Sequence, residues 1–249
     1  MSYLPFHFWY LITNFGGAGL TLPLAFAIAL WLAFGYSWRL AAGWLLLLGV
    51  AVGLVTVTKI AFLGWGIGVR VWDFTGLSGH AMFATAVFPV AAFLALLSAP
   101  PAVRIAGVGL ALLGGAIVGA SRVAVFAHSP SEAITGCIVG ALTALVFVRI
   151  AWNATPPGRL PVMPVVLSLM VIMLGLHKLH LPTQRWVTHI ALKVSGHDRP
   201  FVRAHWKTLR DIDFPSSPAS PALPVSPATP ALPLQKTRNV AMPLIESDA

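Results

Sequence analysis

The sequence predicts an all-α membrane protein in which about six transmembrane helices form a bundle and a Pro-rich tail follows at the C-terminus. The first observation is composition: 57% of the residues are hydrophobic and only 9% are charged, whereas soluble domains carry roughly 25% charged residues. The second is a mean hydropathy of +0.83, which keeps most side chains away from water. The third is a series of six apolar segments separated by short polar stretches. Together these observations predict a chain folded in a lipid bilayer.

The six apolar segments have lengths that suit membrane crossing. A helix rises ~1.5 Å per residue, so segments of about 16–19 residues cover roughly 24–29 Å of the ~30 Å hydrocarbon core. The N-terminus lacks the basic region and cleavage site of a signal peptide, so we predict that the first segment is retained as a helix. The predicted segments are 19–36, 40–58, 81–99, 105–120, 133–148 and 160–176.

Basic residues in the short loops predict the orientation. Arg39, Arg104 and the stretch 149–159 lie in short loops that contain basic residues and no acidic residue. The positive-inside rule places such loops in the cytoplasm. Residues 59–80, residues 121–132 and the chain after residue 176 then lie outside. We therefore predict a protein of the bacterial inner (plasma) membrane whose outer loops face the periplasm or exterior.

Composition divides the chain into a membrane-embedded domain over 1–176, a basic segment over 177–210 that suits a membrane surface, and a disordered Pro-rich tail over 211–249. The basic residues of the first part are scattered singly, which argues against a nucleic-acid partner. In the tail, prolines recur at every third residue from Pro215 to Pro233, the period of a polyproline II helix. We predict a spacer, or alternatively a docking ligand for a protein partner.

Ionisable residues within 1–176 indicate a functional site. Such groups are costly at membrane depth, so their presence is by default a functional hypothesis. Two predicted helices separate the two outer loops, which therefore lie on the same side. These loops hold three cations, two histidines and two carboxylates: Lys59, Arg70, Arg122, His80, His128, Asp73 and Glu132.

This set of side chains suits phosphate chemistry. Cations and helix N-termini bind oxyanions, phosphate above all. A histidine pair can supply a nucleophile and a general acid. Three cations would repel a divalent ion, so we expect no metal and no other cofactor.

Two stretches in these loops resemble motifs of the type 2 phosphatidic acid phosphatase (PAP2) superfamily, which includes membrane lipid phosphatases. The second motif of that family is Pro-Ser-Gly-His, and the third is Ser-Arg-x5-His-x3-Asp. The resemblance extends over roughly residues 15–152 and has the family's motif order and internal spacing. The similar residues are Ser78, Gly79 and His80 in the second motif and Ser121, Arg122, His128 and Glu132 in the third.

The first motif of the family is less similar. Lys59 resembles its lysine, but Gly66 stands where the family has an arginine seven residues later, and the nearest arginine is Arg70. In the second motif Leu77 replaces the proline. In the third motif Glu132 replaces the final aspartate.

The resemblance implies a role for each residue. His128 would be the nucleophile that forms a phosphohistidine, Glu132 would hold its imidazole in the right tautomer, and His80 would protonate the leaving group. The residues expected to bind the phosphoryl oxygens are Lys59, Arg70, Ser78, Gly79, Ser121 and Arg122.

Simpler roles are open for the same residues. Ser129 and Glu132 have the spacing of a capping box, so Glu132 could serve only to start a helix. The two histidines could be interfacial residues. Lys59 and Arg70 could extend from helix ends to the membrane surface.

The resemblance and the depth of the site imply an integral membrane phosphatase that acts, through a phosphohistidine and without metal, on a phosphate monoester or pyrophosphate of a lipid. Phosphatidate, phosphatidylglycerol phosphate, polyprenyl pyrophosphate and lipid A phosphates all fit. The expected partners are this lipid phosphate substrate and the membrane lipids. Two alternatives are a phosphotransferase with a lipid or sugar acceptor and a non-catalytic lipid-phosphate-binding membrane protein.

Overall fold

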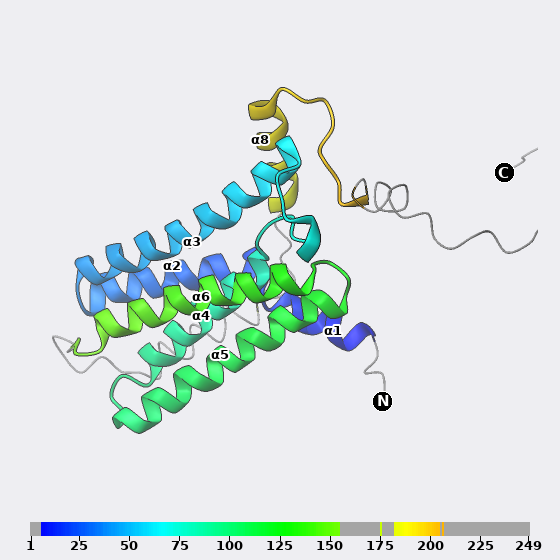
Figure 1. Ribbon diagram of the computed structural model, residues 1–249. Coiled ribbons are helices and arrows are strands. Elements are labelled where there is room, and N and C mark those ends of the chain that lie inside the picture. The colour runs from blue at the N-terminus through cyan, green and yellow to red at the C-terminus, as the bar shows by residue number, and fades with distance from the viewer. Residues whose placement is uncertain (1–5, 155–174, 176–181, 205, 207–249) are drawn as a thin grey trace, which may run out of the picture. The chain divides into compact units, whose positions relative to one another are not determined.

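Helices form the regular structure of the residues that the computed structural model describes, which are 6–154, 175, 182–204 and 206 (Figure 1). The prediction of an all-α fold is confirmed for this part of the chain. The sixth predicted segment, 160–176, lies outside it except for residue 175, and the predicted tail 211–249 lies outside it altogether. The helices are α1 Phe6–Asn14, α2 Ala18–Gly35, α3 Trp38–Trp65, the 3-10 helix η1 Arg70–Trp72, α4 Gly79–Ala95, α5 Pro101–Ala124, α6 Pro130–Ala151 and α8 Thr183–Ser195.

Four stretches among the described residues are helical, long and apolar enough to cross a membrane. The helix α4 is also apolar, but its 17 residues make it shorter than the others. The prediction of about six transmembrane helices is therefore matched in part, by four candidate spans and one shorter apolar helix. The four candidate spans are Phe6–Gly35, Trp38–Trp65, Pro101–Ala124 and Pro130–Ala151.

The end of α3 differs from the prediction. The predicted segment ended at residue 58, but α3 continues past Lys59 to Trp65. A single lysine does not end a helix, because its backbone hydrogen bonds remain intact. The helix ends instead at Gly66, which has φ 70° and donates its backbone N–H to the carbonyl of Phe62. Glycine adopts this left-handed conformation readily.

The predicted outer loops 59–80 and 121–132 are wrong in extent, because the neighbouring helices continue into both of them. Arg122 lies in the last turn of α5, and His80 lies in the first turn of α4. Glu132 lies in the first turn of α6. These three ionisable side chains therefore project from the terminal turns of helices, whose backbones are held by helical hydrogen bonds.

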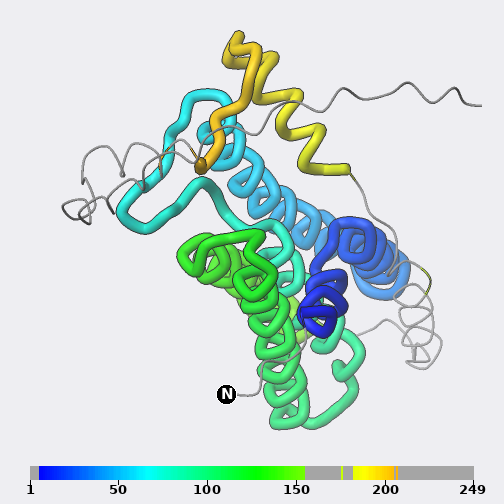
Figure 2. Tube along the Cα trace, turned by 90° about the vertical axis from the view of Figure 1, so that its right-hand side faces the viewer, coloured from blue at the N-terminus to red at the C-terminus, as the bar shows by residue number. Residues whose placement is uncertain are grey.

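The helix α4 is the centre of the bundle. It packs against α5 and α6, and α2 pairs with α3. Figure 1 shows α4 between its two neighbours, and Figure 2 shows α8 alongside α3. Glycines permit the close approach. A Cβ atom at Gly115 would lie 2.8 Å from the Cγ2 atom of Thr85. A Cβ atom at Gly140 would collide with the Oγ1 atom of Thr85 and the carbonyl of Met82. These contacts fix how α4 sits along α5 and α6.

One end of the bundle collects the polar connections. The end of α3, the starts of α4 and α6, the end of α5 and the helix α1 meet there (Figure 1). The helix α8 packs against α3 at this end. Residues from both predicted outer loops are thus brought together at the same end of the bundle.

Candidate active site

The turn between α5 and α6 places a histidine against a buried carboxylate. Ser129 is the N-cap of α6, Pro130 begins the helix, and Glu132 completes a capping box. His128 directly precedes this N-cap, four residues before Glu132, which lies in the first turn of the helix. His128 Nδ1 lies 2.7 Å from Glu132 Oε2, and Oε2 also accepts a hydrogen bond of 3.2 Å from the Ser129 backbone N–H. Glu132 therefore starts the helix and contacts His128 at once.

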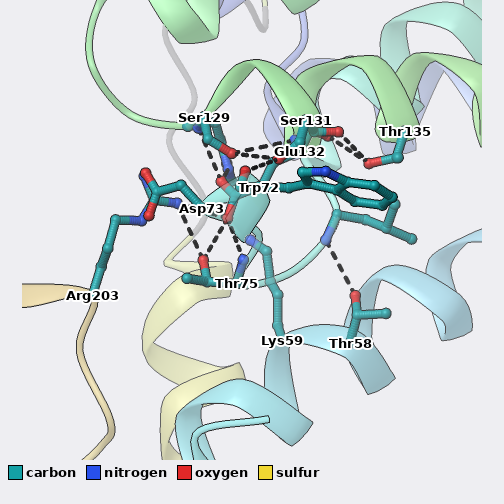
Figure 3. A network of polar contacts seen from close by, with 12 residues as sticks. Thr58, Lys59, Trp72, Asp73, Thr75, Ser129, Ser131, Glu132, Thr135 and Arg203 are labelled. Atoms are coloured by element: carbon teal, nitrogen blue, oxygen red, sulfur yellow. Dashed lines mark hydrogen bonds and ion pairs between the residues drawn. The ribbon is translucent and has the colours of Figure 1, made fainter. Parts of the chain in front are cut away.

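The second oxygen of this carboxylate is bound equally firmly. Oε1 of Glu132 accepts hydrogen bonds from the Thr75 backbone N–H at 2.7 Å and from the Thr75 hydroxyl at 2.5 Å. It also accepts one from Arg203 Nη2 at 2.6 Å (Figure 3). The side chain of Glu132 is 0% exposed. A buried charge requires such partners, because burial removes its hydration.

The connection between α3 and α4 is folded onto the start of α6. Val69 and Phe74 exchange two backbone hydrogen bonds of 2.9 and 3.0 Å, which close a tight turn. The hydroxyl of Ser131 donates to the Trp72 carbonyl at 2.8 Å. The Ser78 backbone N–H donates to the Glu132 carbonyl at 3.1 Å. These bonds hold the start of α4 beside the His128–Glu132 pair.

Two cations from different helices act on His128. Lys59 of α3 donates a hydrogen bond of 3.1 Å from Nζ to Gln184 Oε1, and Arg122 of α5 donates one of 2.8 Å from Nη1 to Thr13 Oγ1. Burial, the largest cause, lowers the pKa of the His128 imidazole below its usual 6.5. The hydrogen bond to Glu132 raises this pKa, and the charges of Lys59 and Arg122 lower it again.

Two buried polar atoms in this region have no hydrogen-bond partner among the described residues. They are Nε of Arg122 and Oγ of Ser78. An unpaired buried donor is costly, so such atoms call for an explanation. Both belong to the residues that were predicted to bind phosphoryl oxygens, and a bound anion would satisfy both.

The turn between α1 and α2 lies against His80. A Cβ atom at Gly16 would lie 2.8 Å from the carbonyl oxygen of His80 and 2.6 Å from Cγ1 of Val118. A Cβ atom at Gly17 would lie 3.8 Å from His80 Nε2. The two glycines therefore let the backbone of this turn cover the start of α4 closely.

Two of the predicted phosphate-binding residues contact protein groups in the structure. Arg70 is exposed in η1, and its guanidinium carbon lies 5.9 Å from the centre of the Trp206 ring. Ser121 is buried, and its hydroxyl donates to the Val118 carbonyl at 2.6 Å. Gly79, by contrast, is the first residue of α4, where a backbone N–H is open to an anion. The phosphate-binding roles of all three remain predictions.

Sequence reasoning missed several polar residues that contact the predicted site. None belongs to a motif, and each contacts a site residue that is distant in the sequence, so no local pattern identifies them. Asp73, whose role was unassigned, lies 3.4 Å from the Nη1 atom of Arg203. The missed residues are Thr13, Thr75, Gln184 and Arg203.

The described residues around His128 do not form a set of metal ligands. Within residues 6–154, 175, 182–204 and 206, no three His, Cys, Asp or Glu side chains gather as metal ligands do. The side chains around His128 instead combine one carboxylate with cations and hydroxyls. Such a combination of side chains suits an anion better than a metal ion.

Comparison with known proteins agrees with this geometry. A protein of Klebsiella pneumoniae described as "Uncharacterized 22.5 kDa protein in cps region" is 37% identical over 201 residues, which cover 78% of this chain and 95% of that protein. The PAP2 superfamily matches residues 70–156. The chain belongs to the PAP2 superfamily. No solved structure matches it.

The PAP2 match contains most of the predicted site but not all of its contacts. It includes α4, α5 and α6, and with them His80, Arg122, His128 and Glu132. It leaves out α1, α3 and α8. This PAP2 protein therefore combines a core that the family pattern recognises with flanking segments that supply further side chains.

Proposed function

We propose that this PAP2 protein is an integral membrane phosphatase that hydrolyses a phosphate monoester or pyrophosphate carried by a lipid. PAP2 proteins are typically metal-independent phosphatases. The observation that carries the proposal is the 2.7 Å contact between His128 Nδ1 and the buried Glu132 carboxylate. A carboxylate at Nδ1 favours the tautomer that is protonated there, which leaves the lone pair on Nε2 for attack.

The first chemical step forms a phosphohistidine. Nε2 of His128 attacks phosphorus, a nitrogen–phosphorus bond forms, and the bond from phosphorus to the leaving oxygen breaks. His80 donates a proton to the leaving oxygen, so that the lipid departs as an alcohol or a monophosphate. Glu132 stabilises the positive charge that develops on the His128 ring.

The second step returns the enzyme to its starting state. A water molecule attacks the phosphohistidine, and His80 accepts the proton that this water loses. The nitrogen–phosphorus bond breaks, inorganic phosphate leaves, and His128 is neutral again. No metal takes part, because the cations of the chain stabilise the phosphoryl oxygens.

Phosphoryl binding is assigned to the polar atoms around His128. Lys59 and Arg122 supply positive charge, and the charge of each lowers the pKa of His128. The unpaired Nε of Arg122 and Oγ of Ser78 are available to phosphoryl oxygens. The Gly79 N–H at the start of α4 adds a helix N-terminus. Such donors act most strongly on the charge of the transition state.

The place of the site supports a lipid substrate. The polar residues lie at one end of helices that are apolar enough to cross a membrane. A lipid can keep its tails in the bilayer while its phosphate reaches this end. The basic loops at Arg39 and Arg104 are assigned to the cytoplasm by the positive-inside rule, so the site faces the periplasm or exterior in this proposal.

The test is phosphate release by the protein purified in detergent with EDTA present. The substrates are phosphatidate, phosphatidylglycerol phosphate, a polyprenyl pyrophosphate and a lipid A phosphate. We expect turnover that survives EDTA and falls more than about 10⁴-fold in His128→Ala. His189→Ala is the matched control, because His189 is an exposed histidine of α8, and it should match the wild-type rate.

Three results would contradict this proposal. Absence of release from every substrate would remove the hydrolase assignment. Release that appears only after a lipid or sugar alcohol is added would identify a phosphotransferase. Equal activity of His128→Ala and the wild-type protein would remove His128 as the nucleophile.

A further inference from the structure

Residues 201–204 and 206 form a docked stretch at the end of α3. The Phe201 backbone N–H donates to the Leu63 carbonyl at 2.9 Å. Trp206 is 7% exposed, and its ring lies edge-on to Phe62 with the ring centres 5.1 Å apart. A backbone hydrogen bond and a buried tryptophan thus hold the two ends of this stretch. The stretch is separated in sequence from the PAP2 match by about fifty residues.

Glycines near the end of α3 make room for this docked stretch. A Cβ atom at Gly66 would lie 2.9 Å from the Phe201 ring, and one at Gly68 would lie 2.5 Å from the Trp206 ring. Gly64 lies against α8, where its Cβ atom would be 3.1 Å from Ser195 Cβ. The end of α3 is therefore shaped to receive both α8 and the residues that follow it.

Arg203 projects from the docked stretch onto the carboxylate of the site. Its Nη2 atom donates to Glu132 Oε1 at 2.6 Å and to Thr75 Oγ1 at 3.2 Å. Its Nη1 atom lies 3.4 Å from Asp73 Oδ2. The side chain is 27% exposed, whereas that of Glu132 is 0% exposed. Arginine thus binds the two carboxylates with different nitrogens, and it fixes the side of Glu132 that faces away from His128.

The contact with Arg203 limits the conformational freedom of the Glu132 side chain. A glutamate has one more rotatable bond than the aspartate that the family motif carries at this position, so its carboxylate can take more orientations. Hydrogen bonds to Oε1 restrict the orientation of the carboxylate when their donors are themselves held in place. Thr75 is one such donor, and Arg203 is the charged one. With Oε1 held by these donors, Oε2 is directed at His128 Nδ1.

We propose that Arg203 is a positioning residue of the active site, which holds the Glu132 carboxylate so that it orients His128. The docked stretch, residues 201–204 and 206, is then part of the catalytic unit, although it lies outside the PAP2 match. This inference rests on the proposed phosphatase function. It assigns to Arg203 an effect on the rate of the chemical step and none on the capture of the lipid.

The test compares variants of Arg203 in the full-length protein. Arg203→Ala should lower kcat by about 10- to 100-fold, the usual effect of losing a side chain that orients a reacting group, with KM within about twofold of wild type. Arg203→Lys keeps a positive charge and should recover part of the loss, whereas Arg203→Gln should not. Arg199→Ala is the matched control, because Arg199 is an exposed arginine four residues earlier, and it should leave both constants unchanged.

A double-mutant cycle distinguishes positioning from a merely structural role. If Arg203 acts through Glu132, then adding Arg203→Ala to Glu132→Gln should lower the residual rate by no more than about threefold, because the interaction is already lost. A radiolabelled lipid phosphate makes these low rates measurable. Additive losses in the cycle would overturn the inference. The Lys and Gln variants keep a polar side chain and part of the aliphatic stem, so the comparison holds even where Arg203→Ala does not fold.

The outcomes separate this inference from the function on which it depends. If the wild-type protein releases no phosphate from any lipid, the proposed function fails. If the wild-type protein is active and His128→Ala is inactive, but Arg203→Gln equals wild type in kcat, the inference about Arg203 is overturned and the function stands. If KM rises while kcat is unchanged, Arg203 binds the substrate and the positioning role is likewise overturned.

Discussion

The PAP2 core and the segments that flank it contribute differently to the site. The core, residues 70–156, carries His80, Arg122, His128 and Glu132 on the ends of α4, α5 and α6. The flanks carry partners for these side chains. Thr13 of α1 accepts a hydrogen bond from Arg122, and Arg203 donates one to Glu132. The proposed reacting groups thus belong to the core, and several of the contacts that hold them belong to the flanks.

The contact between His128 and Glu132 and the contacts that the flanks supply differ in sequence separation. His128 and Glu132 are four residues apart, whereas Arg122 and Thr13 are 109 apart and Arg203 and Glu132 are 71 apart. A contact within one helical turn forms whenever the helix forms. A contact across the chain requires the correct packing of several helices. The core therefore sets which reaction is possible, and the flanks set how accurately its groups are held.

The largest effect is expected at Glu132, where core and flank meet. Glu132→Gln keeps the shape but removes the charge, and kcat should fall on the order of 10³- to 10⁴-fold, as for loss of the carboxylate in a catalytic triad. Glu132→Asp keeps the charge but has a shorter side chain, so it cannot reach His128 and Arg203 together. Its kcat should lie between that of the wild-type protein and that of Glu132→Gln. Steady-state kinetics on the best lipid substrate measures both. Wild-type kcat in Glu132→Gln would reduce Glu132 to its capping role.

The next effect concerns the packing of the core. Gly140→Ala places a methyl group against Thr85 and the Met82 carbonyl, and we expect it to destabilise the protein by about 1–3 kcal/mol, as overpacking does. Gly114→Ala is the matched control, because a Cβ atom there meets nothing within 4 Å among the described residues. Alanine has a higher helix propensity than glycine, so Gly114→Ala should stabilise the protein by up to about 1 kcal/mol. Thermal unfolding in detergent compares the two variants, and equal midpoints would show that α4 is not tightly packed.

The dependence of activity on pH tests how the flanks and core act together on His128. Burial lowers the pKa of His128, and the charges of Arg122 in the core and Lys59 in the flank lower it further. The nucleophile must be neutral, so the acid limb of kcat/KM should lie below pH 6.5. At pH 5.5, one unit below that value, kcat/KM should be less than about tenfold below its maximum. An acid limb at or above pH 6.5 would contradict the lowered pKa.

The same shift predicts the sign of the change in stability. The unfolded chain binds a proton at His128 near pH 6.5, and the folded chain binds it only at lower pH. Below pH 6.5 the unfolded state therefore holds more protons, and this contribution to stability is lost as the pH falls from 6.5 to the pKa of the folded state. His128→Asn removes the titration and should flatten the dependence of the unfolding midpoint in this range.

The difference between core and flanks also explains what the sequence could predict. Helical segments and the motif around His128 follow from hydropathy and local spacing, so α2 to α6 and the position of the site at one end were accessible. The double role of Glu132 was accessible as two alternatives, because the capping box and the motif share the same residues. Arg203 was not accessible, because it is one of nine basic residues after residue 176 and only packing selects it.

The end of α3 shows a second limit. A lysine in an apolar segment suggested the end of the helix at residue 58, but the backbone continues until Gly66. The hydropathy of the segment indicates where side chains leave the hydrocarbon core of the membrane. The left-handed glycine at position 66 marks where the helix ends. Lys59 therefore lies in α3, which positions its ammonium group more firmly than a loop would.

The smallest effect is expected at Gln184, a flank residue that contacts Lys59. Gln184 is exposed, so water can replace it as the acceptor for one of the three donors of the Lys59 ammonium, and such an exchange is worth about 0.5 kcal/mol. Gln184→Ala should therefore change KM by less than about threefold and leave kcat unchanged, whereas Lys59→Ala removes the charge itself and should lower kcat/KM far more. A loss above about tenfold in Gln184→Ala would mean that α8 orients the phosphate-binding lysine as firmly as Arg203 holds Glu132, because no water-replaceable contact has so large an effect.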